Sequence, residues 1–350
     1  MVPQISLSRR WWRVYLLAGV CLAAFLFSVL LWPGKPHPKP RPAALPRGRL
    51  LRSAGGGLQR RPLFRPGTQE PRVLCMVVTT PQYYRGRARH IKATWGHWGN
   101  GACPNTVFLS FTPDDILQNV IISNFSSIMA SHALSRLLYS YEDLWGKVVD
   151  GFLQLNASAA DWFMKADDDT FLIYPNLLNL LAHLDPSEAL YLGLPLIYRP
   201  EGGEEITYMS GGAGYVLSST ALTRLQAAHA PAHCRYPGHT QYEDVNMGYC
   251  MAALGVRAAD TRDGLGRPRF LPYPPWRLLQ SEPHPDFAWL VHFSKYKFRF
   301  GPESLSDLVV TFHEIRDPVD FYFIQYLVND LRLLSPGASS PFTLSQIPSR

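Results

Sequence analysis

The chain has 350 residues, 47% of them hydrophobic and 17% charged, which is enough for one large folded domain or two small ones. Its formal net charge is +7, but residues 1–72 carry 13 Lys/Arg against one acid, so the remaining residues carry a net charge of −5. A nucleic-acid-binding domain needs a basic patch on its folded part, so this distribution argues against a nucleic-acid partner.

The first long apolar stretch, Val14–Trp32, carries no charge. At about 1.5 Å per residue, a helix of this length is just long enough to cross about 30 Å of hydrocarbon. Arginines precede it, tryptophans lie at both ends, and it is longer than the core of a cleaved signal peptide. We therefore predict a cytosolic tail over residues 1–13 and an uncleaved transmembrane signal anchor over residues 14–32. A cleaved signal peptide is the alternative.

A Pro/Arg/Gly-rich segment follows over residues 33–70. It has few apolar side chains to bury, so we expect a disordered stem. We predict the folded domain over residues 71–334 and a flexible Ser/Pro-rich tail over residues 335–350. Two glycosylation motifs, at Asn124 and Asn156, favour a lumenal location for the folded domain.

Four of the five cysteines fall in the folded part, and their spacing matches no zinc motif. In a lumenal domain they can pair in three ways. Pairing of sequence neighbours is our first choice, which joins Cys75 to Cys103 and Cys234 to Cys250. Four free thiols are the alternative.

Strand-like and helix-like segments alternate from residue 72 onward, which predicts an α/β domain with an open, partly parallel sheet. Strands are expected over residues 72–80, 106–111, 162–166, 189–193 and 307–315. Helices are expected over residues 85–96, 141–155, 176–184, 219–228 with Ser219 as its cap, and 317–334 with Asp317 and Pro318 at its start.

The buried strand that ends at Ala166 runs directly into three acids, Asp167, Asp168 and Asp169. Adjacent carboxylates repel one another, and a hard divalent cation relieves that repulsion. Residues two apart in a strand or tight turn point the same way, so Asp167 and Asp169 can reach one ion while Asp168 points elsewhere. An acidic turn or a helix N-cap is the alternative.

Three further stretches carry side chains or backbone suited to a ligand. The glycines of Gly211–Gly214 allow close approach of backbone to a ligand, although a glycine-softened strand has the same composition. Glu243 and Asp244 begin a helix, where one can serve as a general base or both can simply complement the helix dipole. His313 ends a strand, and a structural histidine is the alternative there.

These motifs, in this order, resemble the inverting β1,3-glycosyltransferases of the Golgi, and within them the core 1 β1,3-galactosyltransferases. The resemblance covers about residues 72–332, and its most specific part is the run YMSGGAGYVLS at 208–218. The other motifs that carry it are the first strand at 73–79, RHIKATW at 89–95, ADDDT at 166–170, ED at 243–244 and VTFH at 310–313.

The resemblance implies a GT-A-type open mixed sheet flanked by helices and transfer of galactose from UDP-galactose, with Mn²⁺ as cofactor, to GalNAc-Ser/Thr of glycoproteins. It implies a single-pass type II Golgi membrane protein with a lumenal catalytic domain, and it leaves a homodimer open. It also implies both cysteine pairs named above. The implied metal ligands are Asp167, Asp169 and His313, the implied catalytic base is Asp244, and the implied donor-binding residues are Val78, Glu142, Lys147, Asp167, Gly211, Gly212 and Trp289.

The chain departs from the family pattern at three places, all bearing on the acceptor side. Residues 302–306 lack the adjacent cysteines that the family has before its last strand, and the aromatic segment 286–291 is altered, with Trp289 displaced by one position. Glu314 stands where the family has a tyrosine. Transfer of another sugar, such as fringe-like N-acetylglucosamine transfer, is therefore an alternative, and so is a non-catalytic lumenal chaperone of the same fold. That chaperone relative lacks the acidic motif, which this chain keeps.

Overall fold

The computed structural model describes residues 69–331, apart from 98, 124–143, 229–233, 235, 239–240 and 281–284. The expected cytosolic tail, signal anchor and C-terminal tail, nearly all of the expected stem, and the residues Asn124 and Glu142 lie outside this part, so those predictions and the domain boundaries stay predictions. Among the described residues, no helix combines the length and the apolar character needed to cross a membrane.

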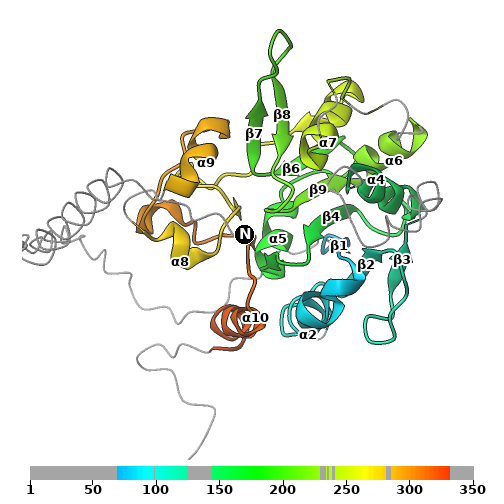
Figure 1. Cartoon of the computed structure of the whole chain (residues 1–350), viewed down its shortest axis with the longest axis vertical. Helices are drawn as coiled ribbons and strands as arrows, with labels where there is room; N and C mark the ends of the chain where they lie inside the picture. The colour runs from blue at the N-terminus through cyan, green and yellow to red at the C-terminus, as the bar shows by residue number, and fades with distance from the viewer. Residues whose placement is uncertain are drawn as a thin grey trace, which may run out of the picture. The chain divides into compact units, whose positions relative to one another are not determined.

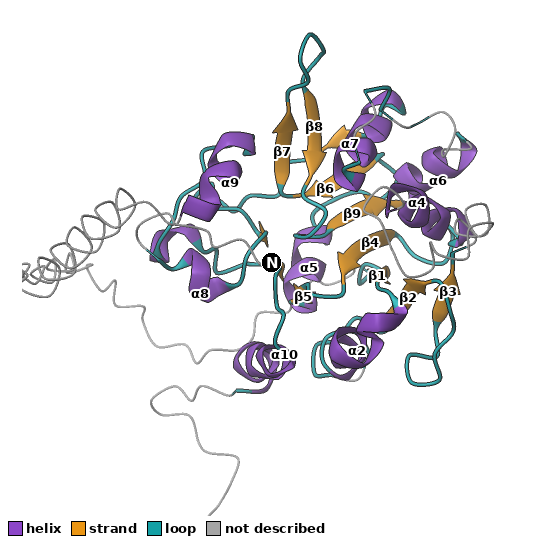
Figure 2. Ribbon diagram, viewed as in Figure 1, coloured by secondary structure: helices purple, strands orange, loops and turns teal. Residues whose placement is uncertain are grey.

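A seven-stranded mixed sheet forms the centre of the domain (Figures 1 and 2). Neighbouring strands run parallel, except that β9 is antiparallel to both β4 and β6. The expected α/β class and the open mixed sheet flanked by helices are therefore confirmed. In spatial order the strands are β10 (Arg257–Ala258), β6 (Leu190–Gly193), β9 (Tyr215–Ser218), β4 (Trp162–Asp167), β1 (Val73–Val78), β2 (Asn105–Ser110) and β3 (Val120–Ile122).

Helices cover both faces of this sheet because its central strands are apolar on both sides. Along β1, Met76 and Val78 belong to one core, while Cys75 and Val77 belong to the other. The first core is completed by α4 (Leu144–Gln154), α6 (Ser219–Ala227) and α7 (Glu243–Ala253) (Figure 1). The second is completed by α2 (Arg89–Ala93), α5 (Tyr174–Leu181) and α10 (Pro318–Gln325).

Two small sheets complete the described part. In the first, β12 (Thr311–Phe312) pairs in parallel with β11 (Phe270–Leu271) and antiparallel with β5 (Phe171–Leu172). The second is the antiparallel pair β7 (Pro195–Tyr198) and β8 (Ile206–Met209). The remaining elements are α8 (Pro275–Leu278), α9 (Ala288–Phe293), the 3-10 turns Pro81–Tyr83, Pro285–Phe287 and Pro302–Ser304, and the π-helical turns Tyr84–Ala88 and Tyr326–Asp330.

Several expected elements differ in their bounds. The cap of α6 is Ser218 rather than Ser219, because the Ser218 hydroxyl accepts from the Ala221 amide at 3.1 Å. The strand expected over residues 307–315 is regular only over β12. The helix expected after Asp317 becomes π-helical after Gln325, although Asp317 caps it as expected through the Val319 amide at 2.9 Å.

Both expected disulfides are present, Cys75–Cys103 and Cys234–Cys250. The first joins the buried strand β1 to the segment that enters β2. The second joins Cys234, which lies between α6 and α7, to Cys250 within α7. Both half-cystines of the first pair are fully buried. The Cys75–Cys103 bond therefore constrains the entry to the central sheet.

Removing this bond with Cys75→Ala and Cys103→Ala together is expected to lower the free energy of unfolding by about 3–4 kcal/mol. The bond closes a loop with a sequence separation of 28, and the freed loop gains conformational entropy in the unfolded chain. Denaturant unfolding monitored by tryptophan fluorescence measures the change. In strong reductant, the difference in free energy of unfolding between wild type and double variant should largely disappear. A difference that persists there would mean that lost packing, and not the lost bond, destabilises the variant.

Candidate functional site

The three acids lie at the turn between β4 and β5. Asp167 is the last residue of β4, and Asp168 and Asp169 form the turn. Thr170 closes it, since its amide donates to the Asp167 carbonyl at 3.1 Å and its hydroxyl accepts from the Asp167 amide at 3.2 Å. The acids therefore project from the carboxyl end of a central strand, where α/β sheets commonly bind ligands.

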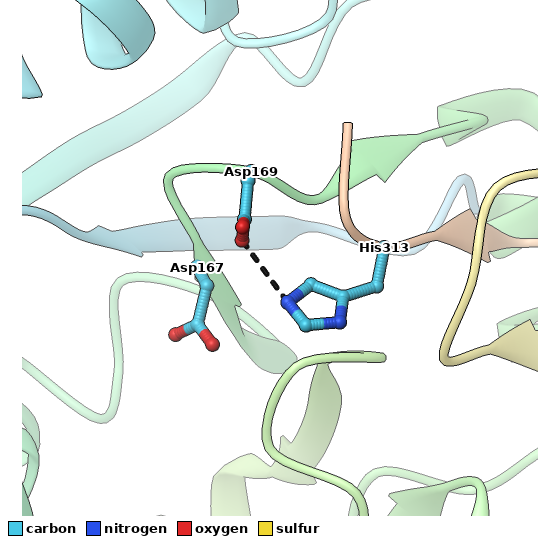
Figure 3. A group of neighbouring side chains, drawn as sticks. All are labelled: Asp167, Asp169 and His313. Carbon is cyan, nitrogen blue, oxygen red and sulfur yellow. Dashed lines mark ion pairs between the residues drawn. The ribbon is translucent and has the colours of Figure 1, made fainter. Parts of the chain in front are cut away.

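The small sheet brings His313 to this turn. Because β12 is antiparallel to β5, with Phe312 opposite Phe171, the residue after Phe312 lies beside the residues before Phe171. His313 Nε2 is 3.0 Å from Asp169 Oδ1, and one ligand atom from each of Asp167, Asp169 and His313 lies within 4.8 Å of the others (Figure 3). The expected convergence of these three side chains is therefore found, and their metal binding stays a prediction.

The chemistry of this Asp-Asp-His group suits a divalent cation. His313 Nδ1 lies 3.2 Å from the Pro272 carbonyl, and donation of the Nδ1 proton there leaves the Nε2 lone pair facing the carboxylates. Two carboxylates and an imidazole match Mn²⁺ better than Ca²⁺. The His313–Asp169 spacing also fits, since neighbouring ligand atoms in an octahedron with bonds of about 2.1 Å lie about 3 Å apart.

Asp168 points away from this group, as the period of two predicts. Its carboxylate accepts from the Thr79 hydroxyl at 2.8 Å and from Arg87 Nη1 at 3.1 Å. Burial raises the pKa of Asp168 to about 6, while these two donors favour its ionised form. Arg87 also approaches Asp169 Oδ2 at 3.5 Å. The guanidinium therefore offsets the charge of two of the three acids from one side of the turn.

Lys165 neutralises the acids from the other side, and the sequence reasoning missed it. Its ammonium is buried and lies 2.7 Å from Asp167 Oδ1 and 3.7 Å from Glu243 Oε2. Burial alone would lower the pKa of Lys165, but the two carboxylates hold it above its ordinary value. The available signal was a single charged residue inside an otherwise apolar strand, two positions before Asp167 and so on the same face.

The glycine loop connects this cation to Asp244. The Gly211 carbonyl accepts from Lys165 Nζ at 3.1 Å, and the Gly211 amide donates to Asp244 Oδ2 at 3.0 Å. Gly212 lies against His313, and a Cβ at this position would stand only 2.7 Å from Nε2 of the ring. Glycine at 212 is thus required by the close approach of the imidazole. The predicted role of both glycines in lining the donor stays a prediction.

Glu243 and Asp244, at the start of α7, are in different environments. Glu243 is buried and accepts from the Tyr215 hydroxyl at 2.7 Å, and burial raises its pKa to about 7 against the opposing effect of Lys165. Asp244 keeps part of its surface exposed to solvent. Loss of hydration still raises the pKa of Asp244, and the hydrogen bond from the Gly211 amide opposes that rise. A partly exposed carboxylate of raised pKa is suited to accept a proton, so Asp244 remains the better candidate base.

The expected donor-binding residues of β1 and α4 lie beside the acidic turn. Val78 is paired with Asp167 in the sheet register, at the end of β1. Lys147 is fully buried and donates to the Thr79 carbonyl. Its Nζ also makes a cation–π contact with Phe111, 4.3 Å from the ring centroid. Burial lowers the pKa of Lys147 to about 7, although the nearby Asp168 and Asp167 oppose that shift. Their contact with a nucleotide sugar stays a prediction.

Trp289 lies on α9, with 37% of its surface exposed. Its indole Nε1 donates to the Tyr273 hydroxyl at 2.6 Å, and Tyr273 directly follows Pro272, whose carbonyl lies against His313. The aromatic segment is therefore adjacent to the Asp-Asp-His group through residues 272–273.

A family model described as Fringe-like matches residues 68–263, which is more than half of the chain. The chain belongs to the Fringe-like family. This Fringe-like protein is 32% identical over 270 residues to a glycoprotein-N-acetylgalactosamine 3-beta-galactosyltransferase 1 of Xenopus laevis, a match that covers 76% of this chain and 68% of the relative. It is 27% identical over 238 residues to human beta-1,3-N-acetylglucosaminyltransferase lunatic fringe, covering 61% of this chain and 57% of that relative.

Among solved structures, this Fringe-like chain is similar to a galactosyltransferase LgtC crystallised with donor and acceptor sugar analogues. The TM-score is 0.37 at 11% identity, and the match covers 74% of this chain and 97% of the other. The family match and the relatives together establish a glycosyltransferase of the Fringe-like family.

Replacing the buried cation with Lys165→Met is expected to lower the free energy of unfolding by about 3–5 kcal/mol in metal-free buffer, because it leaves Asp167 and the buried Glu243 without their counter-charge. Urea denaturation provides the measurement. Lys295→Met is the matched control: Lys295 is exposed and donates to the Thr207 hydroxyl at 3.3 Å, so its loss should stay within about 0.5 kcal/mol. Equal stability of the two variants would show that Lys165 does not offset the acids.

Proposed function

We propose that this protein transfers galactose from UDP-galactose, with inversion, to the 3-hydroxyl of GalNAc-Ser/Thr on glycoproteins. The observation that carries the proposal is the convergence of Asp167, Asp169 and His313 at a strand end, in a Fringe-like chain. The Xenopus laevis relative, whose name states a glycoprotein N-acetylgalactosamine acceptor and a galactosyl group, supports the choice of both sugars.

On the donor side, Asp167, Asp169 and His313 would hold Mn²⁺, a choice that the mixed oxygen and nitrogen ligands support. When bound, Mn²⁺ neutralises the charge that develops on the UDP leaving group. Gly211 and Gly212 bring backbone within reach of the donor sugar, and Val78 and Lys147 border the nucleotide side of the same turn. Glu142, which lies outside the described residues, is assigned to the nucleotide by resemblance alone.

On the acceptor side, Asp244 accepts the proton of the 3-hydroxyl as its oxygen attacks the anomeric carbon. A new carbon–oxygen bond forms to that carbon while its bond to the diphosphate oxygen breaks, and UDP leaves with the bonding electrons. A single displacement of this kind turns an α-linked donor into a β-linked product. Trp289, assigned to the donor by resemblance, lies beside Tyr273 and has an exposed aromatic face, so it can contact the donor sugar where the acceptor meets it.

We further propose a type II Golgi membrane location with this domain in the lumen. Two disulfides suit an oxidising compartment, and a lumenal domain reaches glycoprotein acceptors in the secretory pathway. The signal anchor that this location requires is the predicted segment 14–32.

A fringe-like transfer of N-acetylglucosamine is the second candidate, favoured by the family model and by the similarity to lunatic fringe. A panel of UDP-galactose, UDP-N-acetylglucosamine and UDP-N-acetylgalactosamine, each offered to a GalNAc-threonine peptide with Mn²⁺ or with EDTA, separates the two. Galactose transfer that EDTA abolishes is the expected result. Exclusive transfer of N-acetylglucosamine would support the second candidate, and absence of any transfer or Mn²⁺-dependent UDP binding would support a non-catalytic chaperone.

Asp167→Asn is expected to reduce kcat by roughly 10²–10³-fold, because it weakens a ligand of the ion that stabilises the leaving group. The fold should persist, since Lys165 keeps its contacts with Glu243 and Gly211. Initial rates with the GalNAc-threonine peptide measure the effect, and near-ultraviolet circular dichroism checks the fold. Wild-type turnover in a folded variant would remove Asp167 from the metal site.

Asp244→Asn is expected to reduce kcat by roughly 10²–10⁴-fold while Mn²⁺-dependent UDP affinity changes little, because the amide cannot accept the proton. An Asn oxygen can still accept from the Gly211 amide, so the loop should keep its position. Turnover and calorimetric UDP titration are measured on the same preparation. Loss of UDP affinity in parallel with turnover would assign Asp244 a structural role.

A further inference from the structure

One short segment, residues 272–277, contacts both His313 and the residue after it. The Pro272 carbonyl lies 3.2 Å from His313 Nδ1. Five residues later, Arg277 Nη1 donates to Glu314 Oε2 at 2.6 Å. Arg277 is itself held by stacking, with its guanidinium carbon 4.5 Å from the Tyr273 ring centroid. The segment that leads from β11 into α8 thus contacts two consecutive residues, His313 and Glu314, beside the acidic turn.

Glu314 has an unusual backbone conformation, with φ of +59°. Within the described residues, Gln118 is the one other non-glycine residue with positive φ. A glutamate adopts this left-handed conformation at a cost, so surrounding contacts must hold it there. The shortest ion pair of the Glu314 carboxylate is the one between Arg277 and Oε2. Arg316 Nη2 lies farther away, 3.4 Å from Glu314 Oε1. The Arg277–Glu314 pair is only 28% and 21% exposed, so water weakens it less than an open surface pair.

Glu314 lies between two residues, His313 and Ile315, that both contact Asp169. On one side of Glu314, His313 Nε2 lies 3.0 Å from Asp169 Oδ1. On the other side, the Ile315 amide donates to the Asp169 carbonyl at 2.9 Å. A reversal of the backbone at 314 lets the imidazole and the next amide both reach Asp169. The conformation of Glu314 therefore sets the position of His313.

We propose that the Arg277–Glu314 ion pair is a positioning device that fixes this left-handed turn and so holds His313 in place for the metal ion. Arg277 and Glu314 are positioning residues, which act on the metal site through His313. The inference rests on the proposed function in one respect, that His313 is a metal ligand.

Mn²⁺ affinity, measured from the electron paramagnetic resonance signal of free Mn²⁺, tests this inference. Glu314→Gln keeps the size of the side chain and loses its charge, so the Mn²⁺ Kd should rise by about 10–100-fold, as for other residues that orient a ligand. Asp286→Asn is the matched control: it removes the other carboxylate near Arg277, at 3.3 Å, without touching residues 313–315, and should change the Kd by less than about twofold. Equal effects of the two variants would overturn the inference.

Glycine and alanine at 314 separate positioning from direct binding. Glu314→Gly loses the ion pair but adopts a positive φ without strain, whereas Glu314→Ala loses the pair and keeps the strain. Positioning predicts weaker Mn²⁺ binding in the alanine variant than in the glycine variant. Equal losses in both would identify Glu314 as a ligand in its own right and overturn the positioning role.

A metal-free readout distinguishes failure of this inference from failure of the proposed function. Hydrogen exchange of the Ile315 amide should accelerate at least about tenfold in Glu314→Gln without metal, because its bond to Asp169 opens more often. Faster exchange of the Ile315 amide in Glu314→Gln, with no Mn²⁺ binding by the wild type, would support the role of the ion pair in fixing the turn. It would at the same time contradict the proposed metal site. Unchanged Ile315 exchange together with unchanged Mn²⁺ affinity would overturn the inference and leave the proposed function standing.

Discussion

The site depends on one short antiparallel pairing, between β5 and β12. It places His313 beside the acids at the carboxyl end of the central strand β4, although His313 is more than 140 residues later in the chain. Strands of two residues have little stability by themselves. Here the Ile173 amide donates to the Val310 carbonyl at 2.8 Å, and the Thr311 hydroxyl donates to the Ala213 carbonyl at 2.6 Å. The pairing is therefore fixed by the core and by the glycine loop, which means that the imidazole and the acids are positioned by the same packing.

A second constraint is the charge that collects at this edge of the sheet. Asp167 lies close to Glu243 and Asp244, and Asp168 lies close to Asp169, so burial makes the carboxylates at this edge costly. Two cations of the protein offset part of that charge: Arg87 beside Asp168, and Lys165 beneath Asp167 and Glu243. The face formed by Asp167, Asp169 and His313 is left partly exposed, with side-chain exposures of 29%, 12% and 22%. A divalent ion would complete the neutralisation on that face.

Much of this arrangement follows from local sequence. The apolar run before Asp167 predicts a buried strand, and the period of two correctly separates Asp168 from its neighbours. Neighbouring cysteines pair as expected, because their segments meet in space. The proximity of His313 depends on strand pairing across a long stretch of chain, which no local pattern encodes, so it followed from the family resemblance alone. The roles of Lys165 and Glu314 were not predicted for the same reason: the partners of Lys165 and the backbone conformation of Glu314 are set by tertiary contacts.

The central claim is that Asp167, Asp169 and His313 bind one manganese ion. The most direct measurement is anomalous diffraction at the manganese edge from crystals of the protein grown with Mn²⁺ and UDP. The proposed site predicts a single anomalous peak within bonding distance of all three side chains and of the diphosphate oxygens. A peak elsewhere, or UDP bound beside these residues without a manganese peak, would contradict it.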